Sequence, residues 1–128
     1  MKKILVMTLL LICGMTSAMA QKPANIKFDK LTHNFGTFSE KDPIVTCTFT
    51  YTNVGESPLI INQAVASCGC TVPEYDKDPV KPGERGTIRV RFDSNGKSGT
   101  QYKTIMIFSN SEDDVFELVI TGEVKNEL

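Results

Sequence analysis

The sequence lacks most of the side chains from which catalytic sites are built. It contains no tryptophan and a single histidine, His33, in 128 residues. A lone histidine without a recognisable nucleophile motif leaves no Ser-His-Asp or Cys-His-Asn arrangement. Two groups of acidic residues, at 74–78 and 112–114, lie in turn-like segments, where carboxylates are not held across a cleft as glycoside hydrolysis requires. We therefore predict that the protein is not an enzyme, and no cofactor is indicated.

A marked excess of charge of either sign is also missing. The chain has 14 Lys and Arg residues against 15 Asp and Glu residues, and both signs are interspersed along it. Proteins that bind nucleic acids or anionic membranes rely on clustered basic residues. The composition therefore argues against a nucleic-acid partner.

Only the N-terminal segment has an apolar run of any length. Two lysines precede the run from Ile4 to Ile12, and Ala18-Met19-Ala20 places small residues where signal peptidase requires them. The run is about nine residues long, whereas a membrane-spanning helix needs about 20. We predict a signal peptide over residues 1–20, cleaved between Ala20 and Gln21, with no transmembrane anchor left after its removal.

The rest of the chain, residues 21–128, has the length of one compact domain. Export would place this domain in the periplasm or outside the cell. Lipidation at Cys13 is the less favoured alternative, because the bulky Ile12 precedes that cysteine. The other three cysteines would enter a compartment in which disulfides form, and their odd number leaves at least one thiol unpaired.

After residue 20 the sequence shows no useful helical period, but short alternating apolar runs recur between turn-forming residues. In the clearest run, Val45–Asn53, apolar residues alternate with threonines, as in a half-buried strand. The runs that we expect to form strands are 26–28, 35–38, 45–53, 59–66, 87–92, 102–108 and 115–124. They predict an all-β, immunoglobulin-like sandwich of about seven antiparallel strands. A small barrel and a jelly roll are alternatives, since strand number does not determine topology.

Two connections allow more specific expectations. Asn95-Gly96 favours a type I′ turn, so Thr87–Phe92 and Tyr102–Phe108 should form an antiparallel hairpin. Residues 74–78 include three acidic side chains, but their spacing does not match an EF-hand loop. We interpret them as a solvated loop.

The segment most suited to chemistry is Ser67-Cys68-Gly69-Cys70-Thr71, at the end of a predicted strand. In one interpretation Cys68 and Cys70 form a structural disulfide. In a second, the two thiolates bind copper or zinc, with His33, Cys47, a carboxylate or a second molecule completing the site. In a third, the pair exchanges with partner disulfides, although the Cys-x-x-Cys spacing of thioredoxin-like enzymes is absent.

The other two candidate residues have simpler interpretations. Cys47 falls on the apolar side of its predicted strand and is expected to be a buried free thiol. His33 lies at a polar-to-apolar transition, where a hydrogen bond at a strand end is more common than metal binding or catalysis.

Several short motifs, taken in order and spacing, resemble one family. They are His33-Asn34-Phe35-Gly36-Thr37, Phe49 to Gly55 with its Asn53-Val54-Gly55 end, Ser67 to Thr71, Pro82-Gly83-Glu84 and Gly122. Over about Phe28 to Val124 the chain resembles the DUF1573 family of exported bacterial proteins, common in Bacteroidetes and of uncharacterised function. The resemblance implies a fold like the immunoglobulin-like domains of the major-sperm-protein and ASH type. It supplies no catalytic residues, and Cys47 is not part of its pattern.

Our hypothesis from the sequence is an exported, non-enzymatic binding or structural module of the bacterial cell envelope. Its partner would be another envelope protein, contacted through a sheet edge or the end loops. The alternative is an envelope metal-binding protein, for copper or zinc, or a thiol-redox protein that uses Cys68-Gly69-Cys70.

Overall fold

The structure is a computed structural model that describes residues 22–113 and 115–126. The predicted signal peptide, residues 1–20, and its cleavage site between Ala20 and Gln21 lie outside the described residues. The described part contains eight strands: β1 (Ile26–Phe28), β2 (Thr32–Ser39), β3 (Ile44–Asn53), β4 (Ile61–Ala66), β5 (Thr71–Tyr75), β6 (Arg85–Asp93), β7 (Gly99–Ser109) and β8 (Val115–Lys125). It contains no helix that could cross a membrane.

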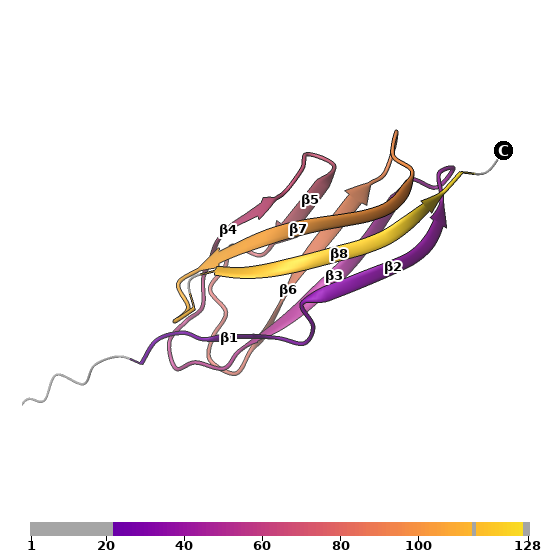
Figure 1. The fold of residues 1–128 in the computed structure, drawn as a ribbon. Coiled ribbons are helices and arrows are strands. Elements are labelled where there is room, and N and C mark those ends of the chain that lie inside the picture. Colours follow the sequence, from indigo (N-terminus) through magenta and orange to yellow (C-terminus); the bar gives the residue numbers. More distant parts are fainter. Residues whose placement is uncertain (1–21, 114, 127–128) are drawn as a thin grey trace, which may run out of the picture.

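The strands form two four-stranded sheets that pack against each other. One sheet has the order β1-β3-β6-β5 and the other the order β2-β8-β7-β4. In Figure 1 the second sheet lies in front of the first. The predicted all-β, immunoglobulin-like sandwich is therefore confirmed.

Two details of the strand arrangement differ from the sequence-based prediction. Strand β5 was assigned in part to a solvated loop, although it pairs antiparallel with β6 at the edge of its sheet. It contains Pro73, and a proline is tolerated in a sheet mainly at such edges. In addition, β2 pairs with β8 in parallel rather than antiparallel.

The predicted hairpin between Thr87–Phe92 and Tyr102–Phe108 is wrong. Strand β6 pairs with β3 and β5, whereas β7 pairs with β8 and β4 in the other sheet. A type I′ turn needs positive φ at both central residues, but of Asn95-Gly96 only Gly96 has it, at 78°. The amide of Lys97 donates to the carbonyl of Ser94 at 2.9 Å, which closes a turn inside a connection that crosses between the sheets.

The core lies between the two sheets and follows the alternation of the strands. On β3, Phe49 and Tyr51 are completely buried, and the intervening threonines point outward. Phe49 lies opposite Ile88 on β6 in the same sheet. The buried side chains of the facing sheet include Ile105, Ile107, Leu118 and Ile120. Each large apolar side chain buried in this way contributes about 1.5–3 kcal/mol to folding.

One buried polar side chain, Asn53, organises an end of the sandwich. Its Nδ2 atom donates to the carbonyls of Ser57, at 2.8 Å, and Val80, at 2.9 Å. Its Oδ1 atom accepts from the amides of Gly55, at 2.9 Å, and Asn25, at 3.4 Å. The carboxamide therefore joins the end of β3 to three segments, the N-terminal segment at Asn25, the turn at Gly55–Ser57 and the segment at Val80.

Position 55 lies beside this hydrogen-bond network and has room only for glycine. A Cβ atom at position 55 would lie 2.3 Å from the amide nitrogen of Asn25 and 2.6 Å from the carbonyl oxygen of Pro23. Both contacts are with backbone atoms, which a side-chain rotation cannot relieve. The sequence Asn53-Val54-Gly55 thus allows the N-terminal segment to pack closely against this turn.

We predict that Asn53→Ala lowers the free energy of unfolding by about 3 kcal/mol, because it leaves buried carbonyl and amide groups without partners. Urea unfolding of the chain without residues 1–20 measures this loss. The matched control is Asn110→Ala. Asn110 makes similar bonds to Ile60 and Pro58 at the surface, where water can replace them, so about 1 kcal/mol or less is expected. Equal losses in the two variants would contradict the proposed importance of the Asn53 network.

Candidate functional site

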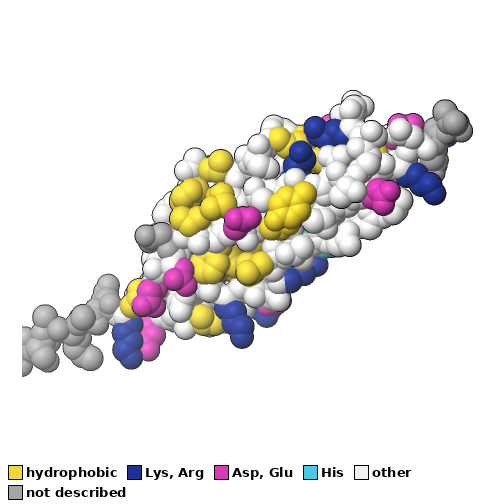
Figure 2. All heavy atoms as spheres, in the orientation of Figure 1, with side chains coloured by type: hydrophobic (Ala, Val, Ile, Leu, Met, Phe, Trp, Pro, Cys, Tyr) yellow, Lys and Arg dark blue, Asp and Glu magenta, His cyan; other side chains and the backbone are white. Residues whose placement is uncertain are grey.

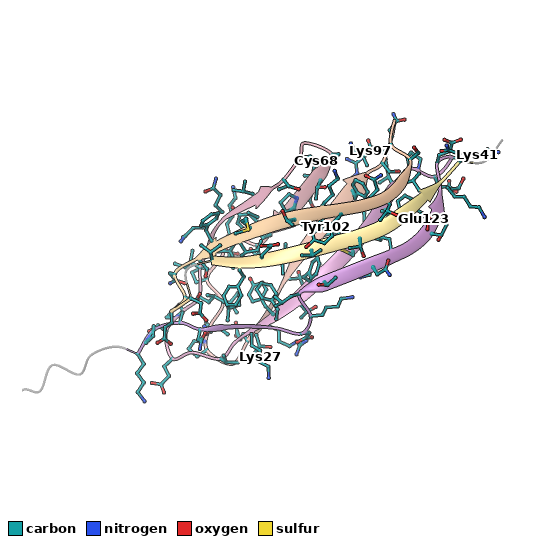
Figure 3. The ribbon with its side chains drawn as sticks, in the orientation of Figure 1. Lys27, Lys41, Cys68, Lys97, Tyr102 and Glu123 are labelled. Carbon is teal, nitrogen blue, oxygen red and sulfur yellow. A yellow bond between two sulfur atoms is a disulfide. The ribbon has the colours of Figure 1, made fainter. Side chains whose placement is uncertain are left out.

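The Cys-Gly-Cys segment forms the turn between β4 and β5, which are edge strands of the two different sheets. The structure joins Cys68 to Cys70 in a disulfide with a Cα–Cα distance of 5.3 Å. Figure 3 labels Cys68 at this turn. As the sequence indicated, the thiols follow the end of a strand. The redox state of the pair in the protein made by cells stays a prediction.

Backbone hydrogen bonds attach this turn to both sheets. The amide of Ser67 donates to the carbonyl of Thr104 on β7 at 2.9 Å, and the amide of Asp93 on β6 donates to the carbonyl of Cys70 at 2.8 Å. Cys70 also packs against the core. The Oγ1 atom of Thr71 lies 3.7 Å from Sγ of Cys68 and 3.8 Å from Sγ of Cys70. The turn thus links the two sheets at one edge of the sandwich.

His33 lies on β2, far from the cysteines. In the sheet order β2-β8-β7-β4, His33 and the Cys68-Cys70 turn are at opposite edges, three spacings of about 4.8 Å apart. The Nδ1 atom of His33 is 2.8 Å from Nζ of Lys30, and its ring packs edge-on against Phe35. Partial burial, and next the charge of Lys30, lower the pKa of His33. The structure therefore does not bring the three metal candidates Cys68, Cys70 and His33 together.

Cys47 cannot complete a metal site at the turn either. It is buried on β3, and burial raises the pKa of its thiol to about 11, although the charge of Lys30 lowers it slightly. At neutral pH this thiol is therefore protonated and behaves as a small apolar group. Within residues 22–113 and 115–126, no three His, Cys, Asp or Glu side chains are grouped so as to hold a metal ion.

Three hollows on the described surface are lined mainly by polar residues. One of about 320 Å³ is lined by loop residues including Glu40, Asn95 and Lys97. Two others, of about 310 and 260 Å³, lie over polar sections of β2, β8 and β5. Neither cysteine of the disulfide nor His33 lines any of these three.

The outer faces of the two sheets differ strongly in chemistry. On the β1-β3-β6-β5 sheet, the outward residues of β3 and β6 are mostly threonine and arginine, such as Thr48 opposite Arg89 and Thr46 opposite Arg91. On the other sheet, apolar side chains point outward from three adjacent strands. We call these the outer apolar face: Val65, Tyr102, Met106, Phe108, Val115 and Val119.

Strand register places most of the outer apolar face close together, over Val65, Met106, Phe108, Val115 and Val119. Tyr102 lies at its border, beyond Thr104 on β7 and opposite Thr121 on β8. Tyr102 is 62% exposed, Val65 41% and Val115 40%. Val65 lies opposite Met106, and Phe108 lies opposite Val115. Figure 2 shows apolar side chains gathered on this side over β4, β7 and β8, and Figure 3 places Tyr102 on it. Because an outer sheet face is normally polar, this surface is the unusual feature of the molecule.

A single acidic residue, Glu117, lies within the outer apolar face. It is exposed and lies opposite Met106 in the pairing of β7 with β8. Val115 and Val119 flank it on the same side of β8. No ion pair to Glu117 is present among the described residues, where the two ion pairs join Lys22 to Glu56 and Arg85 to Asp29.

The outer apolar face was not predicted from the sequence, although a signal for it was present there. The residues Ile105-Met106-Ile107-Phe108 and Val115-Phe116-Glu117-Leu118-Val119-Ile120 are almost uninterrupted apolar runs. Such runs are typical of strands that are covered on both faces. The alternating pattern expected for a half-buried strand accounted only for the residues of these runs that face the core.

Comparison with known proteins places the chain in a sequence family. The model of DUF1573, described as a protein of unknown function, matches residues 26–124. No curated protein matches the chain.

Solved structures with a similar fold include the following three. A protein of unknown function from Porphyromonas gingivalis W83 superposes with a TM-score of 0.70 at 16% identity, over 86% of this chain and 51% of that one. The ASH / PapD-like domain 7 of human CEP192 gives 0.67 at 5% identity, over 83% and 89%. The secreted serine protease VesC from Vibrio cholerae gives 0.59 at 9% identity, over 78% and 23%. The chain thus spans about half of the Porphyromonas protein and a smaller part of the protease.

We predict that the protein, purified without reductant, has an intact mass two hydrogen atoms below that of its fully reduced form. A peptide map should join Cys68 to Cys70, and an alkylating agent should reach Cys47 only after denaturation. Three alkylated thiols, or a native mass increased by a copper or zinc ion, would contradict this expectation.

We further predict that Cys68→Ser with Cys70→Ser lowers the free energy of unfolding by only about 1–2 kcal/mol, because so short a loop restricts the unfolded chain little. Urea unfolding measures the loss. Wild-type protein under reductant is the matched control and should have the same stability as the double variant. A much larger loss in the variant alone would show that the serines disturb the turn.

Proposed function

The chain belongs to the DUF1573 family, and from this premise we propose that it is an exported, non-enzymatic, immunoglobulin-like module of the bacterial cell envelope that binds another protein. The observation that supports binding most directly is the outer apolar face. Apolar surface exposed to water is unfavourable, and a contiguous exposed patch commonly marks a protein interface.

The molecule itself provides the comparison that makes this face significant. Both sheets have the same number of strands and the same core on their inner side. The threonines and arginines of β3 and β6 show that this chain can make a polar outer face. A second polar face on β4, β7 and β8 would serve folding equally well. The apolar residues there are therefore best explained by a partner that covers them.

The arrangement of polar side chains favours binding over catalysis. His33 contacts Lys30 and Phe35, and no serine or cysteine among its described hydrogen-bond partners forms a nucleophile–base pair with it. One similar structure is a secreted serine protease, but this chain covers 23% of that protein at 9% identity. Such a likeness concerns the fold alone.

The N-terminal sequence pattern supports export, and we place the protein in the periplasm or outside the cell. A disulfide between Cys68 and Cys70 would be stable in that oxidising environment. No observation favours the alternative function, in which this pair binds copper or zinc or exchanges disulfides. The experiment below nevertheless separates the two functions.

The test is affinity purification of the tagged protein from the envelope of the bacterium that makes it. We expect a stoichiometric protein partner with wild type and with Cys68→Ser/Cys70→Ser. We expect its loss with Val65→Ser/Tyr102→Ser, which makes the outer apolar face polar. The matched control is Ile44→Ser/Val72→Ser, which removes two similarly exposed apolar side chains from the opposite sheet and should retain the partner.

Two results would contradict the proposed function. One is a preparation without a partner that contains an equivalent of copper or zinc. The other is disulfide exchange activity. In either case the property should disappear in the double serine variant, which would identify the cysteine pair as the functional group.

A further inference from the structure

Glu117 lies where a partner bound to the outer apolar face would contact it. Val115 and Val119 flank it on β8, and Met106 lies opposite it on β7. Val119 also donates its amide to the carbonyl of Leu31, which is 48% exposed. A partner that covers the outer apolar face would therefore also remove the Glu117 carboxylate from water. Burying an unpaired carboxylate is strongly unfavourable.

We propose that the partner is a protein whose apolar contact surface presents a Lys or Arg side chain that pairs with Glu117. This inference rests on the binding function proposed above and specifies the chemistry of the partner. A cation opposite Glu117 compensates for the lost hydration of the carboxylate and fixes the position of the partner on an otherwise non-directional apolar surface.

Charge complementarity distinguishes this partner from two other occupants. Two copies of the chain that met symmetrically through this face would bring two Glu117 carboxylates into one interface, which is repulsive. An anionic lipid surface would likewise repel Glu117, and Glu123 on the same side of β8 would add to that repulsion. Figure 3 shows Glu123 and Tyr102 on this side of the sheet.

Photo-cross-linking in living cells tests the inference. The photoreactive residue p-benzoylphenylalanine replaces Tyr102 on the outer apolar face or, as a control, Val72 on the opposite sheet. We expect a cross-link from position 102 to a different protein. The cross-linked peptide should lie in an apolar surface segment that contains a Lys or Arg.

Substitutions at Glu117 then test the charge pair. With the photoreactive residue at position 102, we expect Glu117→Lys to reduce the cross-linked fraction about tenfold or more, because it places like charges opposite each other. Glu117→Gln should reduce it less. The matched control is Glu74→Lys on β5 of the opposite sheet, which makes the same charge change away from the outer apolar face and should change the fraction little. Reversing the charge of the partner's basic residue should restore binding to Glu117→Lys.

Several outcomes would overturn the inference, and they differ in what they say about the proposed function. Cross-links only from position 72 would mean that the protein binds a partner through its other sheet. A cross-link to a second copy, a contact segment without a basic residue, or an unchanged fraction in Glu117→Lys would reject the partner chemistry alone. Absence of cross-links from both positions would count against this inference and against the proposed function. Equal urea unfolding midpoints for all variants confirm that the fold is retained.

Discussion

The hydrogen bonds of the Asn53 side chain are the constraint on which this end of the sandwich depends. Its carboxamide uses both its donor and acceptor groups inside the protein, toward Ser57, Val80, Gly55 and Asn25. Its backbone adds bonds to Gly83 and Glu84. Because buried polar groups must find partners, one correctly placed asparagine determines how the N-terminal segment and two turns meet β3.

The motifs that identify the family have structural explanations of the same kind. Gly55 permits a close backbone approach, and a Cβ atom on Gly122 would lie 3.0 Å from the Phe38 ring. The Cys68-Gly69-Cys70 turn is bonded to both sheets. These residues stabilise the fold. Residues that bind a partner should therefore be found among side chains that the fold does not require. The outward side chains of β4, β7 and β8 are of this kind, because they do not contribute to the core between the sheets.

The sequence predicted features that depend on residues close together in the chain, and it failed for features that depend on how distant strands are arranged. The alternation of apolar and polar residues identified strands such as Val45–Asn53, since one side of that strand is buried and the other faces solvent. Strand β5 was missed because Pro73 and its acidic neighbours look like a loop, and its place at a sheet edge is a tertiary property. The partner of β6 could not be read from Asn95-Gly96, because a connection of that length can cross between sheets.

The candidate site shows the same limit. The position of the cysteine pair after a strand followed from local sequence, but its distance from His33 depends on strand order. The outer apolar face depends on register across three strands, which brings Val65, Met106 and Phe108 near Val115 and Val119. In the sequence, only the near-continuous apolar runs of β7 and β8 indicated this face.

The central claim, that this face is covered where the protein works, can be measured without knowing the partner. Hydroxyl-radical footprinting compares the oxidation of Tyr102, Met106 and Phe108 in intact cells with that in the purified protein. Ile44 and Val72 on the opposite sheet serve as internal references. We predict that the first three side chains are protected in cells and the two references are not. Equal oxidation of Tyr102 and Met106 in cells and in the purified protein would contradict the claim.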